Sequence, residues 1–229
     1  MLEANTKNWK HLYWIPINAL LAFGLPYLLV NLLGLSHDSY YIWLFGISIL
    51  FVGLYVRRTH LKLGASLKPG WALGTISGLF IGLAFLSMAS ASKPAVETGF
   101  FSAAMLPIFW RGLLYGLVSA VLISVFPFIV VWRALSGVNP RPIRKFGVTL
   151  VAIISIALMS SLYNLGLSGL QNEHLGKRIG KTMIASIPTI ISGSPLAAPI
   201  SNVLLQMSES VESGSLDKLA KSKTSGGIE

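Results

Sequence analysis

The chain has 229 residues, of which 53% are hydrophobic and only 11% are charged, and its mean hydropathy is +0.68. A soluble domain carries about 25% charged residues, and this chain instead contains apolar runs of the roughly 18 or more residues that cross a hydrocarbon layer about 30 Å thick. These values exclude a soluble globular domain and predict an all-α, polytopic transmembrane helical bundle.

The net charge of +10 comes from basic residues in short loops between the apolar runs. Membrane topology and anionic lipid head groups account for that pattern, so we expect no nucleic acid partner. The chain contains no cysteine, which excludes disulfides and thiolate metal ligands. The expected partner is the lipid bilayer, with other membrane subunits or self-association as further possibilities.

Six apolar segments follow one another along the chain. They cover roughly residues 12–34, 40–56, 71–91, 106–132, 146–166 and 182–207. Tryptophan and tyrosine near the ends of several segments mark the membrane–water interface. We therefore expect about six spans in a single transmembrane domain, residues 1–207, followed by a polar, flexible C-terminal tail, residues 208–229.

Basic residues are distributed unevenly among the predicted loops. The second and fourth loops hold most of them: Arg57, Arg58, Lys62 and Lys68, and Arg133, Arg141, Arg144 and Lys145. The first loop has none and the third has only Lys93. By the positive-inside rule, this bias predicts an integral protein of a plasma or inner membrane with a cytoplasmic N-terminus and, if the sixth segment crosses once, a cytoplasmic C-terminus.

The sixth segment contains several helix-breaking residues. Its sequence IPTIISGSPLAAPI includes Pro188, Gly193, Pro195 and Pro199. Each proline removes a backbone donor, and a broken helix at membrane depth must be buried in protein or line a wet cavity. The last segment is therefore either a kinked span or a re-entrant loop, and the second alternative moves the C-terminus outside.

Small residues recur every four positions on two of the segments. Gly74, Gly78 and Gly82 form one such face, and Gly112 and Gly116 begin another. This spacing lets helix backbones approach closely in lipid. The faces predict helix packing, either within the bundle, such as between these two segments, or in a homodimer.

Ionisable groups are absent from the predicted spans. All eight acidic residues lie outside the six segments, and the four histidines lie in loops or at segment edges. Proton relays and intramembrane metal sites depend on such groups. We therefore predict no catalytic residue, no metal and no cofactor, and lean towards a protein that is not an enzyme.

The stretch FWRGLLYG, residues 109–116, resembles the EExxFRGxL motif of the CPBP family, the CAAX-protease and bacteriocin-processing (Abi) intramembrane proteases. In that family two glutamates before the arginine activate water, and the corresponding positions here are Leu106 and Pro107. The stretch SPLAAPISNVLLQ is similar to a late family motif, and it carries Asn202 and Gln206 where a functional relative has histidines. The resemblance implies a non-catalytic relative, a pseudoenzyme.

The remaining polar groups of the spans predict a pocket. Arg111, Asn164, Asn202 and Gln206 together could hold an anionic or amide-bearing small molecule or a lipid head group. Ordinary hydrogen bonding between helices is the alternative for the three amides, and an arginine near a span end can extend its charge to the interface.

The sequence features are compatible with three functions. The first is a non-catalytic scaffold, accessory subunit or lipid- or helix-binding protein, because ionisable groups are absent and helix-packing faces are present. The second is a CPBP-type intramembrane protease or degenerate relative. The third is a small transporter that uses the broken sixth segment.

Overall fold

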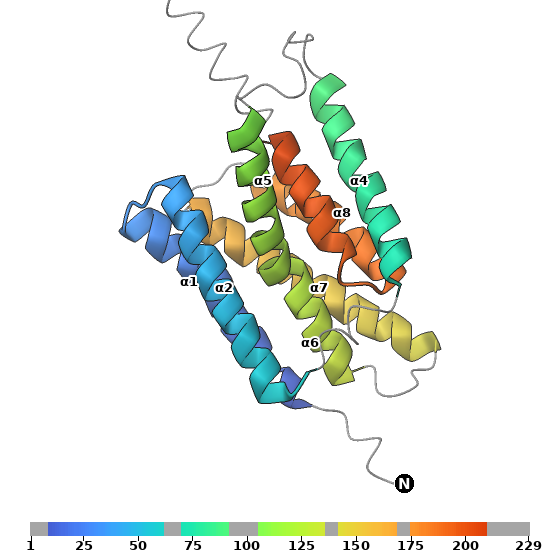
Figure 1. Ribbon diagram of the computed structural model, residues 1–229. Coiled ribbons are helices and arrows are strands. Elements are labelled where there is room, and N and C mark those ends of the chain that lie inside the picture. Colours follow the sequence, from blue (N-terminus) through green and yellow to red (C-terminus); the bar gives the residue numbers. More distant parts are fainter. Residues whose placement is uncertain (1–8, 62–69, 92–104, 136–141, 169–174, 210–229) are drawn as a thin grey trace, which may run out of the picture.

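The computed structural model (Figure 1) describes residues 9–61, 70–91, 105–135, 142–168 and 175–209. Within these ranges the secondary structure is helical and no strand is present. The predicted tail lies outside the described residues apart from its first two positions, Ser208 and Glu209, which end a helix. The all-α bundle expected from the hydropathy pattern is confirmed.

The helices follow the order of the apolar segments. In chain order they are α1 (Trp14–Pro26), α2 (His37–Thr59), α4 (Trp71–Ala91), α5 (Met105–Ala120), α6 (Phe126–Leu135), α7 (Pro142–Ser168) and α8 (Leu175–Ser192), and residues 197–209 form a further helix. A π-helical segment, Tyr27–Leu32, continues α1, and another, Val121–Val125, joins α5 to α6.

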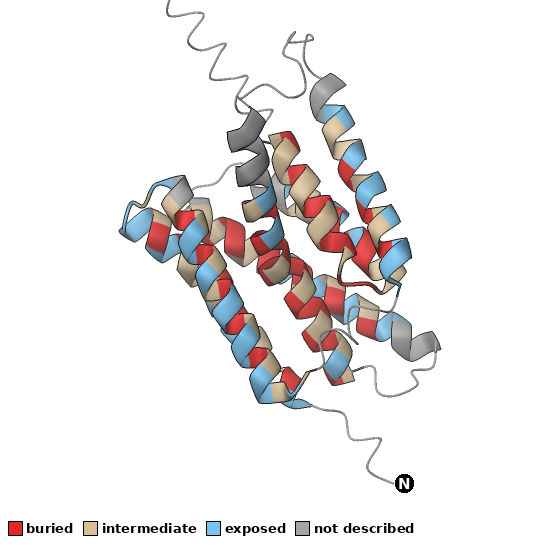
Figure 2. Cartoon of the chain, in the orientation of Figure 1, coloured by how far each residue is buried: buried red, intermediate tan, exposed pale blue. Residues whose placement is uncertain are grey.

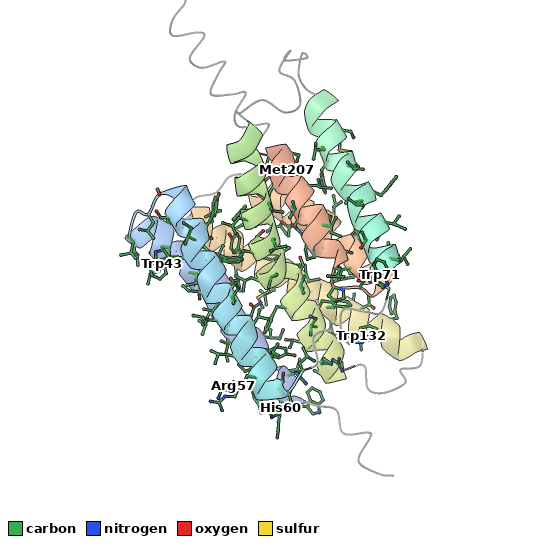
Figure 3. The ribbon with its side chains drawn as sticks, viewed as in Figure 1. Trp43, Arg57, His60, Trp71, Trp132 and Met207 are labelled. Carbon is green, nitrogen blue, oxygen red and sulfur yellow. The ribbon has the colours of Figure 1, made fainter. Side chains whose placement is uncertain are left out.

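Five of these helical stretches are long and apolar enough to cross a membrane. They are Trp9–Leu32, Ser39–Thr59, Trp71–Met88, Leu113–Leu135 and Phe146–Leu167. Successive stretches alternate in direction, so Arg57 and His60 lie at the end of the bundle where the described chain begins, and Met207 lies towards the other end (Figure 3). We call the end that carries Arg57 and His60 the N-terminal end, and the end nearer to Met207 the pocket end.

The stretch Leu113–Leu135 is the centre of the bundle. Of the 18-residue apolar part of this span, 72% is buried inside the protein. The corresponding share in Trp71–Met88 is 17%, so α4 is peripheral. Figure 2 shows the same contrast, with α6 largely buried and the outer faces of α2 and α4 exposed. Aromatic side chains fill the core beside the centre, where the rings of Phe51 and Phe126 lie 4.6 Å apart. Apolar exposure on the outer helices is what a lipid solvent permits.

The π-helical segment in this central stretch leaves one backbone carbonyl without a helical donor. The N–H of Phe126 bonds to the carbonyl of Val121, five residues earlier, as in a π-helix. In the same pattern residue 127 would donate to the carbonyl of Leu122, but Pro127 has no N–H. The side chain of Asn18, fully buried on α1, donates from Nδ2 to the Leu122 carbonyl at 2.8 Å. An amide from the first span therefore satisfies a carbonyl that proline leaves open in the fourth.

The sixth apolar segment folds as a helical hairpin. Helix α8 ends at Ser192, Gly193 takes a positive φ of 64°, and a turn leads into the helix 197–209. The backbone N–H of Ala198 donates to Thr189 Oγ1 at 2.8 Å, so the two arms run antiparallel. The predicted break is thus confirmed, but the first arm starts at Leu175, inside the basic loop, and the chain reverses instead of continuing as one kinked helix.

The predicted glycine faces lie against the turn and the second arm of this hairpin. A Cβ at Gly74 would meet Ser194 Cβ at 2.6 Å, one at Gly78 would meet the Ala197 carbonyl at 2.7 Å, and Gly82 and Gly116 lie equally close to Leu204 and Val203. Both glycine-bearing helices therefore contact residues 194–204, which is a different pairing from one between the two faces. The surroundings of Gly112 lie outside the described residues.

Candidate functional site

A polar cavity of ≈ 200 Å³ lies at the pocket end of the bundle. We call it the tyrosine pocket, and its lining residues are Val30, Tyr40, Tyr41, Tyr115, Asn164, Leu167, Lys181, Thr182, Leu205, Gln206 and Glu209. Most of its wall is polar, although the surrounding helices are apolar. Ligand pockets usually measure about 300–1,000 Å³, so this cavity has room for a small polar group and not for a large ligand.

The tyrosine pocket is at one boundary of the membrane-spanning region. Tyr40 and Tyr41 stand at the start of the span Ser39–Thr59, and the ring of Tyr115 on α5 lies 4.7 Å from that of Tyr41. Asn164 and Leu167 stand at the end of the span Phe146–Leu167. Since these ends lie together, the cavity is at the depth where hydrocarbon gives way to lipid head groups.

Aromatic hydroxyls form one wall of the pocket. The hydroxyls of Tyr40 and Tyr163 lie 2.8 Å apart, and Tyr163 is buried behind the cavity. The rings of Tyr41 and Tyr115 are 4.7 Å apart, which joins α2 to α5 at this level. A phenol can both donate and accept a hydrogen bond, so this wall suits an oxygen-rich ligand.

An ion pair forms the other wall, and the hairpin positions it. Lys181 Nζ lies 3.1 Å from Glu209 Oε1, with side-chain exposures of 26% and 34%. Lys181 is in the first arm and Glu209 ends the second, so the antiparallel arms place opposite charges side by side. Partial burial strengthens their attraction relative to a fully exposed pair.

The predicted pocket residues are separated in the structure. Asn164 and Gln206 both line the tyrosine pocket, while Asn202 is buried elsewhere and donates from Nδ2 to the Ala198 carbonyl of its own helix at 2.9 Å. Arg111 belongs to α5, but its side chain lies outside the described residues. Of the predicted residues, Asn164 and Gln206 therefore belong to the lining of the tyrosine pocket, and Asn202 does not.

The tyrosines and the ion pair were absent from the predicted pocket. Tyrosines near span ends also indicate interfacial anchoring, which is how Tyr40 and Tyr41 are interpreted from sequence. Lys181 and Glu209 lie in stretches that the hydropathy pattern assigns to a loop and to a tail. Within the described residues, His, Asp and Glu side chains form no group of three that could hold a metal ion.

Comparison with known proteins returns no relative of this chain: no family, no curated protein and no solved structure matches it. The resemblance of residues 109–116 to the CPBP motif therefore stays a prediction. The positions corresponding to that family's glutamates, Leu106 and Pro107, lie in α5, and their side chains are outside the described residues.

Proposed function

We propose that this chain is a non-catalytic membrane protein that binds the head group of a zwitterionic phospholipid in the tyrosine pocket. The observation that carries the proposal is the half-buried pair Lys181–Glu209 beside tyrosine hydroxyls at the membrane boundary. A phosphate next to an ammonium group matches one cation next to one anion. The cavity volume agrees with a head group and is too small for a whole lipid.

Each part of the head group has a counterpart in the lining. The phosphate faces the Lys181 ammonium and the tyrosine hydroxyls, which supply hydrogen-bond donors. The ligand's ammonium faces the Glu209 carboxylate, and the amide oxygen of Gln206 is a further acceptor. A primary ammonium donates three hydrogen bonds, so phosphoethanolamine suits this wall better than phosphocholine.

Binding is tested with the purified protein and short-chain phospholipids in detergent. Dihexanoyl phosphatidylethanolamine should raise the midpoint of thermal unfolding with saturable concentration dependence, because a ligand that binds only the folded state stabilises it by RT ln(1 + [L]/Kd). The choline and glycerol analogues should bind more weakly. Absence of a saturable shift with all three lipids would refute the proposal, and lipid hydrolysis during incubation would refute its non-catalytic part.

Variants of the ion pair locate the binding site. Lys181→Gln and Glu209→Gln should each weaken ethanolamine-lipid binding by about tenfold or more, since each leaves one ligand charge without its partner (~1.4 kcal/mol). Lys10→Gln is the matched control, because Lys10 is exposed at the N-terminal end. Equal binding by all three variants would place the site elsewhere.

The proposed orientation puts the N-terminal end in the cytoplasm and the tyrosine pocket in the outer half of the membrane. The basic residues Arg57 and Arg58, in the last turn of α2 at the N-terminal end, support this (Figure 3). The C-terminus then follows the re-entrant alternative, because the hairpin returns residue 209 to the end opposite residue 9.

Cysteine labelling tests the orientation directly, since the chain contains no cysteine. In intact cells, an impermeant maleimide should label Ser225→Cys and should label Thr6→Cys only after permeabilisation. Protection of both positions would restore the prediction of two cytoplasmic termini and would contradict a re-entrant hairpin.

A further inference from the structure

A buried histidine ties the segment before α1 to the rest of the bundle. His11 ends a short 3-10 helix, Trp9–His11, in which Trp9 and Lys10 are exposed while His11 is only 5% exposed. His11 Nδ1 lies 2.7 Å from the Tyr55 hydroxyl on α2, and α6 also contacts this short helix. His11 therefore joins the entering chain to two other helices at the N-terminal end.

Aromatic rings hold the partner of His11 in place. Tyr55 is 1% exposed, and the rings of Trp14 and Phe126 lie 5.4 Å and 4.9 Å from its ring. The His11 ring itself meets the Tyr55 ring edge-on at 5.7 Å. Water is thus largely excluded from the hydrogen bond between the two side chains, and a charge placed there loses most of its hydration.

The charges around His11 also oppose a positive imidazole. Tyr55 faces it from α2 and Arg133 acts on it electrostatically from α6, while α1 contributes the uncharged Trp14 to the same cluster. Among the acidic residues, only Glu209 has a described side chain, and it lies at the pocket end. Protonation of His11 would therefore bury a second cation near Arg133, with no described carboxylate to balance it.

From this arrangement we propose that His11 is a pH-sensitive latch, which holds residues 9–13 against α2 and α6 when it is neutral and releases them when it is protonated. In the proposed orientation the latch faces the cytoplasm. It does not depend on the head-group site, because the tyrosine pocket lies at the opposite end of the bundle.

The direction of the pH effect follows from proton linkage. The released imidazole is hydrated and takes up a proton near its ordinary pKa of about 6.5, whereas the docked imidazole resists protonation. The segment should therefore stay docked above about pH 7.5 and be released progressively below about pH 6.5. At about pH 5.5 roughly nine-tenths of released imidazoles are protonated, which raises the released fraction by up to about tenfold.

Hydrogen exchange of the full-length protein in detergent, measured by mass spectrometry, tests the latch. The backbone N–H groups of Leu12 and Ile15 donate to the carbonyls of Trp9 and Leu12, so both amides should exchange faster when the segment leaves. His11→Gln keeps a hydrogen-bonding side chain but takes up no proton. It should exchange like wild type at about pH 7.5, and wild type should exchange about fivefold faster than the variant at about pH 5.5.

His60→Asn is the matched control. His60 lies at the same end of the bundle but is exposed, and its φ of 52° is one that asparagine tolerates (Figure 3). This variant should keep the full acid response of wild type. Equal exchange of wild type and His11→Gln at about pH 5.5 would overturn the inference, as would loss of the acid response in His60→Asn.

Arg133→Gln tests the latch with His11 in place, and so remains informative if His11→Gln does not dock at any pH. Removing the positive charge near His11 makes protonation of the docked imidazole less costly, so acid should release the segment less than in wild type. The ratio of Leu12 and Ile15 exchange at about pH 5.5 to that at about pH 7.5 should fall about twofold or more below the wild-type ratio. An equal or larger ratio would overturn the inference.

Discussion

The hydrogen bond from Asn18 to the Leu122 carbonyl should be energetically coupled to Pro127. Proline leaves this carbonyl without a helical donor, and the Asn18 amide replaces it at 2.8 Å. In Pro127→Ala the chain regains a backbone N–H that can bond to Leu122. The Asn18→Ala substitution should therefore destabilise the wild-type background more than the Pro127→Ala background.

The magnitude follows from what each substitution exposes. Hydrogen bonds between membrane helices contribute about 0.6 kcal/mol on average and at most about 1.7 kcal/mol, and an unsatisfied buried carbonyl adds about 1–3 kcal/mol. Asn18 Oδ1 is buried and has no hydrogen-bond partner among the described residues. Asn18→Ala also removes this unsatisfied oxygen, which offsets part of the destabilisation caused by the lost hydrogen bond. We expect a coupling free energy of about 1 kcal/mol between the two positions.

The assay is reversible unfolding in mixed detergent micelles of the wild type, both single variants and the double variant. Asn31→Ala is the control, because Asn31 donates to the Gly166 carbonyl at 2.7 Å and should add independently to Pro127→Ala. Equal effects of Asn18→Ala in both backgrounds would refute the view that the asparagine compensates for the proline.

Two further substitutions test the packing of the hairpin. Gly78→Ala should destabilise the fold by about 1–3 kcal/mol, since its Cβ would meet the Ala197 carbonyl at 2.7 Å. Gly53→Ala is the control, because its Cβ has open space and the substitution should be neutral or slightly stabilising. Equal midpoints of thermal unfolding for the two variants would contradict the close contact between Gly78 and Ala197. The hydroxyls of Ser124 and Ser186 lie 2.7 Å apart, so cysteines at both positions should form a disulfide under mild oxidation, seen by mass spectrometry, and a pair that stays reduced would place α8 elsewhere.

Hydropathy predicted the spanning helices closely because the thickness of a membrane fixes the length of an apolar helix. The expected segments 40–56 and 146–166 correspond to the stretches Ser39–Thr59 and Phe146–Leu167. The hairpin was predicted only as one of two alternatives. Proline and glycine end a helix locally, but the direction of the following chain depends on contacts such as Ala198 to Thr189, which local sequence does not contain.

The candidate site was predicted in part for a similar reason. Amide side chains in a span are few and costly to expose to lipid, so Asn164 and Gln206 could be selected as pocket residues from composition alone. Asn202 satisfies the same criterion but bonds to its own helix. Which face of a helix lines a cavity is decided by the packing of neighbouring helices, and a single sequence does not determine it.

The charge pair of the pocket depends on the reversal of the chain. A continuous helix from Lys181 to Glu209 would separate these residues by about 42 Å, which exceeds the thickness of the hydrocarbon layer. The turn at Gly193 instead brings the two side chains to 3.1 Å. Loss of the turn would therefore remove the proposed binding site and move the C-terminus to the opposite side of the membrane. Any variant that moves the Ser225→Cys label to the cytoplasmic side should for this reason also lose ethanolamine-lipid binding.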